Sequence, residues 1–181
     1  MSSQNLSDAE ITGFVRQLIN YIHTQHDYHL PLASPLSEEQ TIVLQPFFPP
    51  AIPEQARVVT RGREPIVNPP MIAELRSRGF NFAPDLNHLN VVSFLKIQTL
   101  HHLSDRALFH GLVHTVQGYV IGVDRCLELN VRSFLKTGRH VTIPLFAHAF
   151  RLDHRFAHSP ASTFSVEAEV KSWHAVGRYN P

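Results

Sequence analysis

Cysteine, excess charge of one sign and long apolar runs are scarce in this sequence. Cys126 is the only cysteine, so the chain cannot close a disulfide within itself, which suits a reducing cytosol. The 16 basic and 15 acidic residues leave a net charge of +1, so charge gives no reason to expect nucleic acid or a membrane surface as a partner. The longest apolar stretches, 91–95 and 143–150, are too short to span a bilayer. The first five residues lack the basic start and apolar core of a secretory signal, so we expect a cytoplasmic protein.

The composition is that of a packed globular protein. Hydrophobic residues make up 43% of the 181 residues and charged residues only 17%. This length and balance predict a single domain over residues 1–181 with a proper core. Histidine is the one residue type in clear excess, because the chain has 13 and most of them lie between His88 and His174.

The N-terminal third divides into a helix and a proline-rich segment. Ser7 can cap a helix and Glu10 has the capping-box spacing, so a helix is predicted to begin at Asp8. Nine prolines interrupt residues 30–70, which excludes long helices and central strands there. We expect this segment to wrap over the surface of the domain, with a short strand near Ala56–Thr60.

The rest of the chain alternates helical periodicity with one β-rich stretch. The patterns predict one strand, over Val91–Gln98, because this stretch is rich in β-branched and aromatic residues. The predicted helices cover Met71–Arg78, Ala107–Gln117, Gly122–Lys136, Pro144–Phe156 and Phe164–Val176. The predicted fold class is therefore α+β, with several helices and a small sheet.

One predicted helix carries a pair of histidines in the segment HGLVH, residues 110–114. Histidines four residues apart on a helix project from the same face, so His110 and His114 could bind one metal ion. The apolar residues around them indicate a buried helix, which suits a site shielded from water. On spacing alone, a pair of core or hydrogen-bonded histidines is the more common arrangement.

The wider context resembles the metal-binding helix of zincin metallopeptidases of the gluzincin kind, in which His-Glu-Leu-Val-His is followed by a hydrophobic pair and Gln. The sequence matches at His110, Leu112, Val113, His114 and Gln117. The resemblance covers roughly residues 91–175 and implies a zincin-like core with a divalent metal, zinc first and copper or iron as alternatives. It also implies a third ligand from a glutamate on a later helix, where the matching segment is residues 144–150.

Both carboxylates of that family are replaced. The general-base position holds Gly111, and the third-ligand position holds Phe146. Glycine supplies no base for a metal-bound water, so ordinary peptide hydrolysis is not expected. The exchanges predict a void beside the two histidines at Gly111, with Phe146 as an aromatic wall of the same pocket.

Other residues near the motif are candidates for the site. His148 could complete a three-histidine metal site, although it lies about 200° around a straight helix from position 146. Two further pairs, His101 with His102 and His154 with His158, are also possible ligands, and Tyr119 could line the pocket as a hydrogen-bond donor. Cys126 is expected to be a core thiol.

Three functions remain open on the sequence. The first is a metal-binding enzyme that is not a peptidase and acts on a small organic substrate, since the replacements trade charge for apolar space. The second is a pseudoenzyme that keeps the fold to bind a partner. The third is a hydrolase whose base comes from elsewhere, with Glu167 or Glu169 as candidates.

Overall fold

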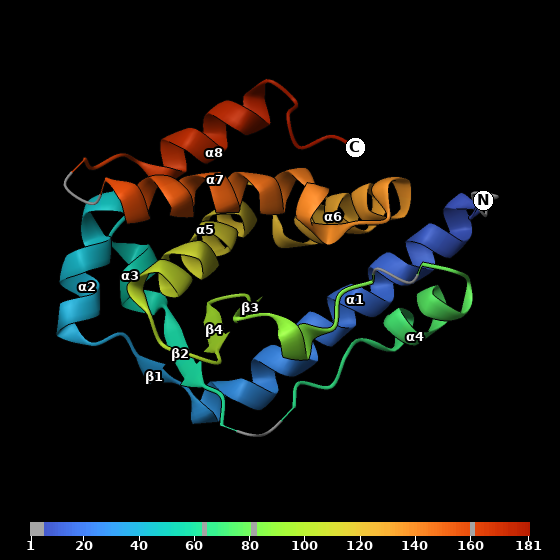
Figure 1. Ribbon diagram of the computed structural model, residues 1–181, viewed down its shortest axis with the longest axis horizontal. Helices are drawn as coiled ribbons and strands as arrows, with labels where there is room; N and C mark the ends of the chain where they lie inside the picture. The colour runs from blue at the N-terminus through green and yellow to red at the C-terminus, as the bar shows by residue number, and fades with distance from the viewer. Residues whose placement is uncertain (1–5, 63–64, 81–82, 160–161) are drawn as a thin grey trace.

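The computed structural model describes residues 6–62, 65–80, 83–159 and 162–181 and has an α+β fold, as predicted (Figure 1). The first five residues, where no secretory signal is expected, lie outside these ranges. The helices are α1 (Asp8–His29), α2 (Glu38–Leu44), α3 (Ala51–Gln55), α4 (Pro70–Ser77), α5 (Asp105–Ile121), α6 (Val123–Thr137), α7 (Pro144–His158) and α8 (Val166–Ala175). Within the described ranges, no helix is long and apolar enough to cross a membrane.

A small mixed sheet lies under the central helix. Its strands are β1 (Ser34–Pro35), β2 (Arg57–Thr60), β3 (Val91–Phe94) and β4 (Ile97–Leu100), in the order β1-β2-β4-β3. Strands β2 and β4 are parallel, and the two outer pairs are antiparallel.

The single strand predicted over 91–98 is wrong, because the chain reverses direction inside it. Leu95 has a φ of 58°, a left-handed conformation that a bulky residue rarely adopts. The turn carries none of the Gly, Asn or Asp residues that usually mark a hairpin, so no local pattern predicts the reversal.

Local signals predict several of the helix ends, although α5 continues to Ile121, past the predicted end at Gln117, and α2 and α3 are not among the predicted helices. Ser7 and Glu10 form a complete capping box at the start of α1. Ser104 and Ser165 accept a hydrogen bond from the first turns of α5 and α8. Gly122, with a φ of 94°, separates α5 from α6, a conformation that favours glycine.

Helix α5 is the centre of the molecule. It packs against α6, α7 and α8 and, on its other side, against the β3–β4 hairpin. In Figure 1, α7 and α8 lie above α5, and the hairpin and α1 lie below it. Five apolar side chains in the middle of α5 are fully buried: Leu108, Phe109, Leu112, Val113 and Val116. This position fixes the two motif histidines inside the fold.

The proline-rich segment forms short elements that close one end of the core. Phe47 and Phe48 are buried, and their rings lie 5.6 and 5.1 Å from the ring of Phe109 on α5. The predicted short strand is present as β2. The expectation that this segment holds no central strand is wrong, because β2 lies between β1 and β4 and is paired with both. Aromatic anchoring of this kind explains how a segment with so many prolines is held against the domain.

Candidate functional site

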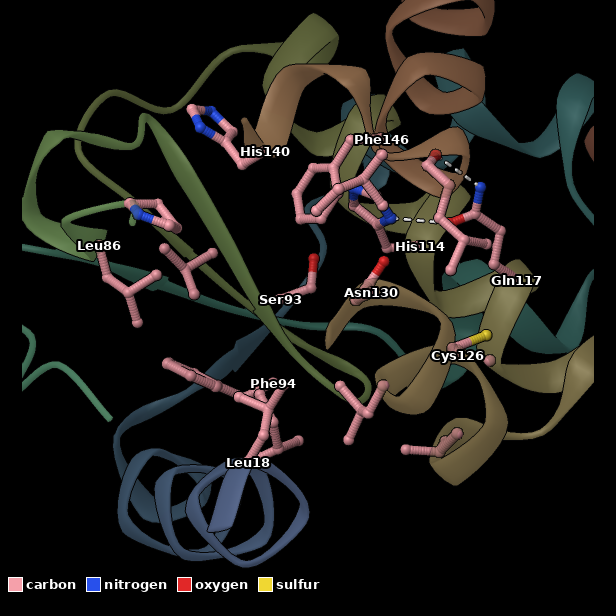
Figure 2. A pocket seen from close by; sticks show the side chains of 18 of the residues that line it. Leu18, Leu86, Ser93, Phe94, His114, Gln117, Cys126, Asn130, His140 and Phe146 are labelled. Atoms are coloured by element: carbon pink, nitrogen blue, oxygen red, sulfur yellow. Dashed lines mark hydrogen bonds between the residues drawn. The ribbon is translucent and has the colours of Figure 1, made fainter. Parts of the chain in front are cut away.

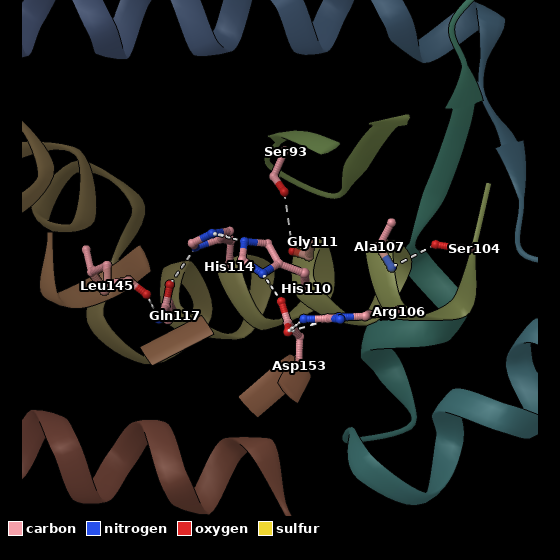
Figure 3. A network of polar contacts seen from close by, with 10 residues as sticks. All are labelled: Ser93, Ser104, Arg106, Ala107, His110, Gly111, His114, Gln117, Leu145 and Asp153. Atoms are coloured by element: carbon pink, nitrogen blue, oxygen red, sulfur yellow. Dashed lines mark hydrogen bonds and ion pairs between the residues drawn. The ribbon is translucent and has the colours of Figure 1, made fainter. Parts of the chain in front are cut away.

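The two motif histidines meet on one face of α5 (Figure 3). The Nε2 atoms of His110 and His114 are 3.2 Å apart, and the rings are nearly perpendicular. His110 is buried and His114 is half-buried. Two phenylalanines of α7 cover the rings: Phe146 lies 4.9 Å from His114 and Phe150 lies 4.7 Å from His110, measured between ring centroids.

A buried carboxylate fixes the ring of His110. The Nδ1 atom of His110 lies 2.7 Å from Oδ2 of Asp153 on α7. Arg106 donates to the other carboxylate oxygen, at 2.8 Å, which keeps Asp153 paired with a cation. A carboxylate paired in this way accepts hydrogen bonds, so Nδ1 of His110 carries a proton and donates it.

Gln117 fixes the ring of His114 in the same way. Its Nε2 atom donates to the carbonyl oxygen of Leu145 at 3.0 Å, and a carbonyl can only accept. This contact sets the orientation of the amide, so Oε1 faces Nδ1 of His114, at 2.8 Å. Since Oε1 also only accepts, Nδ1 of His114 must donate.

The hydrogen bonds to Asp153 and Gln117 determine the protonation of the two Nε2 atoms that face each other. A neutral imidazole has one protonated nitrogen, so when both Nδ1 atoms donate, both Nε2 atoms present lone pairs. Two lone pairs 3.2 Å apart repel each other unless a proton or a metal cation lies between them. Burial, with a smaller contribution from His110, lowers the pKa of His114, so that ring is neutral at pH 7. The two Nε2 atoms therefore share one cation, which is either a proton, as in an N–H···N hydrogen bond with a protonated His110, or a metal ion.

The histidine pair lies at one wall of a cavity of about 390 Å³. The cavity is enclosed by α1, α4, β3, α5, α6 and the start of α7, and most of its lining is aliphatic or aromatic. Figure 2 shows Ser93 and Asn130 directed toward the part of the cavity where His114 and Phe146 lie. A mostly apolar cavity of this size with a few polar groups is typical of a small-molecule site.

Two polar atoms in the cavity lining have no hydrogen-bond partner among the described residues. They are the hydroxyl of Tyr21 on α1 and Oδ1 of Asn130 on α6. Burial raises the pKa of Tyr21, so its hydroxyl stays protonated and remains a donor. Unpaired buried polar groups are costly, so these two atoms are natural contacts for a bound ligand or water.

The space expected beside Gly111 is filled. A Cβ at position 111 would overlap Oε1 of Gln98, a residue of β4, and would lie 2.9 Å from its Cδ atom. Gly111 is therefore a point of close approach between α5 and the hairpin, and it does not line the cavity. The void lies instead beyond the imidazoles, toward α1 and α6.

The structure does not bring His148 to the histidine pair. Its Nδ1 atom is hydrogen bonded to the hydroxyl of Tyr179, and its ring stacks on Trp173 with the centroids 4.0 Å apart. His148 therefore faces α8, as expected from its angle on the helix. Among the described residues, no cluster of three or more His, Cys, Asp or Glu side chains is placed to hold a metal ion.

The remaining candidates lie at the edge of the cavity or away from it. Tyr119 lines the rim of the cavity and is 71% exposed. Glu167 is paired with Lys171, and Glu169 is paired with Arg151 and Arg155. Both glutamates are on α8, and neither lines the cavity.

Sequence reasoning missed Asp153 and Gln98. Asp153 is the only acidic residue of α7 and follows Phe146 by seven residues, the spacing of a shared helix face. That pattern could have drawn attention to it. Gln98 could not be identified because the sequence predicts one continuous strand over Val91–Gln98, without the reversal that turns Gln98 toward α5.

No family model, curated protein or solved structure matches this chain.

Proposed function

We propose that this protein binds a small organic molecule in the cavity beside the histidine pair and acts on it with a metal ion held by His110 and His114. The proposal rests on one observation: the Nδ1 atoms are hydrogen bonded to Asp153 and Gln117, while the two Nε2 atoms face each other. In this proposal the site is a zincin-type metal site remodelled for a substrate other than a peptide.

The two nitrogens fit a first-row metal ion. Zinc–nitrogen distances of about 2.05 Å and a tetrahedral angle place two ligand nitrogens about 3.3 Å apart, close to the 3.2 Å seen here. A metal-binding histidine usually donates a hydrogen bond from the N–H of its other ring nitrogen to a carboxylate, a carbonyl or water. Here the carboxylate of Asp153 and the amide oxygen of Gln117 accept these hydrogen bonds. With these two protein ligands, the other coordination positions are free for water or ligand oxygens. A metal there would supply Lewis-acid polarisation of a ligand oxygen.

The residues around the pair each have a distinct task in this proposal. Asp153 and Gln117 orient the two imidazoles, and Phe146 and Phe150 cover them and exclude water. The Asn130 amide oxygen can accept a hydrogen bond from the ligand. The apolar walls favour a ligand with a mainly hydrocarbon body.

Binding without metal is the second candidate. It is favoured by the same geometry, because a proton shared by the two Nε2 atoms satisfies both rings as well as a metal does. The protein would then be a binding module that retains the fold without turnover. The third candidate, hydrolysis with Glu167 or Glu169 as base, has no support in the geometry, since both are held in ion pairs on α8.

Cobalt(II) binding tests the proposal. Cobalt(II) bound through imidazole nitrogens has visible absorption bands whose intensity reports its coordination number. We expect saturable binding to the wild-type protein that is lost in both His110→Ala and His114→Ala. The control is His154→Ala, because His154 and His158 form an exposed pair with the same spacing.

The outcome separates the candidates. Binding that disappears with His154→Ala and survives in the α5 variants would overturn the proposed site. A protein that binds no cobalt or zinc yet gains stability from apolar small molecules would favour the binding module.

A further inference from the structure

A second cavity, independent of the histidine pair, lies at the C-terminal end of α1. Its volume is about 500 Å³, and it is lined by residues of α1, β2 and the chain that follows β2. Its most unusual members are His29 and Arg61, which are only 8% and 7% exposed. Burial this deep is rare for an arginine without an acidic partner.

Arg61 is a buried positive charge with no carboxylate partner among the described residues. Its two terminal nitrogens donate to the backbone carbonyls of Leu86 and Leu89, at 3.4 and 2.5 Å. Its Nε–H group has no hydrogen-bond partner among the described residues. The described lining of the cavity contains no Asp or Glu. The charge is therefore neutralised by no described group.

His29 adds a second unsatisfied group to the same cavity. Its ring stacks on Phe94 with the centroids 5.4 Å apart and the planes 10° from parallel. Neither ring nitrogen has a hydrogen-bond partner among the described residues. Burial, with a smaller contribution from the charge of Arg61, lowers the pKa of His29, so the ring is neutral and keeps one N–H donor at pH 7.

We infer that this cavity binds a small organic carboxylate, with its negative charge on Arg61 and its hydrocarbon part against the apolar wall. A single guanidinium matches one negative charge, which favours a carboxylate over a doubly charged phosphate. The wall that would hold the hydrocarbon part is formed by Leu32, Val59, Ile66 and Val67. The unpaired N–H groups of Arg61 and His29 supply the hydrogen bonds that a carboxylate accepts.

The test compares hexanoate with its uncharged analogue hexanamide and with inorganic phosphate, by calorimetric titration and thermal unfolding. We expect hexanoate to bind saturably and raise the unfolding midpoint, because a ligand that binds only the folded state stabilises it. Hexanamide and phosphate should bind at least about tenfold more weakly, because hexanamide lacks the negative charge and phosphate lacks the hydrocarbon chain. Phosphate binding as tight as hexanoate binding would overturn the choice of ligand class.

Variants connect the binding to the cavity. Arg61→Gln should weaken hexanoate binding by on the order of tenfold to a hundredfold. Arg57→Gln is the matched control, because Arg57 is at the start of β2, which ends just before Arg61, and also donates to backbone carbonyls but does not line the cavity. Equal affinity in wild type and Arg61→Gln would contradict the inference.

A second variant guards against misfolding. His29→Phe keeps a ring that can stack on Phe94 and removes the N–H donor, so it should fold and bind hexanoate several-fold more weakly. Unchanged hexanoate binding in His29→Phe would also count against the site. Cobalt binding by His110 and His114 should be unaffected in all three variants, which separates this site from the proposed metal site.

Discussion

Gln98 and Gly111 are matched in shape across the contact between β4 and α5: the end of the Gln98 side chain occupies the place where any other residue at 111 would carry its Cβ. Gln98 is held there by its own hydrogen bonds, accepting from Ser93 at 2.6 Å and donating to Thr115 at 3.0 Å. The glycine in the middle of a buried helix is thus required by packing. A glutamate at this position would displace Gln98.

Gly111→Ala is therefore expected to destabilise the fold, although alanine is the better helix former. Overpacking of this kind costs about 1–3 kcal/mol, which exceeds the gain of up to about 1 kcal/mol from helix propensity. Urea unfolding measures the change. Gly13→Ala in α1 is the control, because a Cβ there meets nothing within 4 Å, and it should be neutral or stabilising. In the Gly111→Ala background, Gln98→Ala should cost less than it does alone.

Asp153→Asn is expected to weaken zinc binding about 10- to 100-fold with little change in fold. The amide can donate to Nδ1 of His110, which moves the ring proton to Nε2 and removes one of the two lone pairs. Competition with a metal indicator measures the affinity. The control is Asp105→Asn, in the exposed first turn of α5, the helix that carries His110; this variant should bind zinc like the wild type. Equal affinities in all three proteins would contradict the proposed role of Asp153.

Phe146→Glu alone is expected to tighten zinc binding. The ring of Phe146 lies 4.9 Å from that of His114, so a carboxylate from this position can join the two imidazoles as a third ligand. Gly111→Glu is not needed and would clash with Gln98. Phe146→Gln is the control for loss of the ring without gain of charge. If the glutamate and glutamine variants bind zinc equally, position 146 does not reach the metal.

The stability of the protein is expected to fall in mild acid because of His148. Burial lowers the pKa of His148 to about 4, from 6.5 in the unfolded chain. The charges of Arg151 and Arg178 also lower this pKa, while that of Glu169 raises it. Between these two values the unfolded state binds a proton that the folded state does not, so stability falls as the pH drops from about 6.5 toward 4. The effect of this group between pH 7.5 and pH 5 should be about 2 kcal/mol.

His148→Phe tests this assignment, because phenylalanine can keep the stacking on Trp173 but cannot titrate. The variant loses the contact with Tyr179 and is expected to be less stable at pH 7.5. Its free energy of unfolding, measured in urea, should nevertheless fall less between pH 7.5 and pH 5 than that of the wild type. The same fall in both proteins would show that other groups cause the acid sensitivity.

The sequence by itself predicted six of the helices and most of their ends, but not α2 and α3 in the proline-rich segment. Capping serines, glycines at left-handed positions and apolar periodicity act within a few residues, so they can be read along the chain. The same local geometry placed His110 and His114 on one face and turned His148 away from position 146.

Only the tertiary structure decided what those side chains meet. Asp153 is 43 residues from His110, and Arg61 is 28 residues from the carbonyl of Leu89. No local pattern encodes such pairs, because they depend on how α7 packs on α5 and on how the hairpin is seated. The reversal at Leu95 places Gln98 against Gly111, and the turn contains no Gly, Asn or Asp from which it could be predicted. The convergent lone pairs of the two histidines likewise follow from partners that packing of the folded chain supplies.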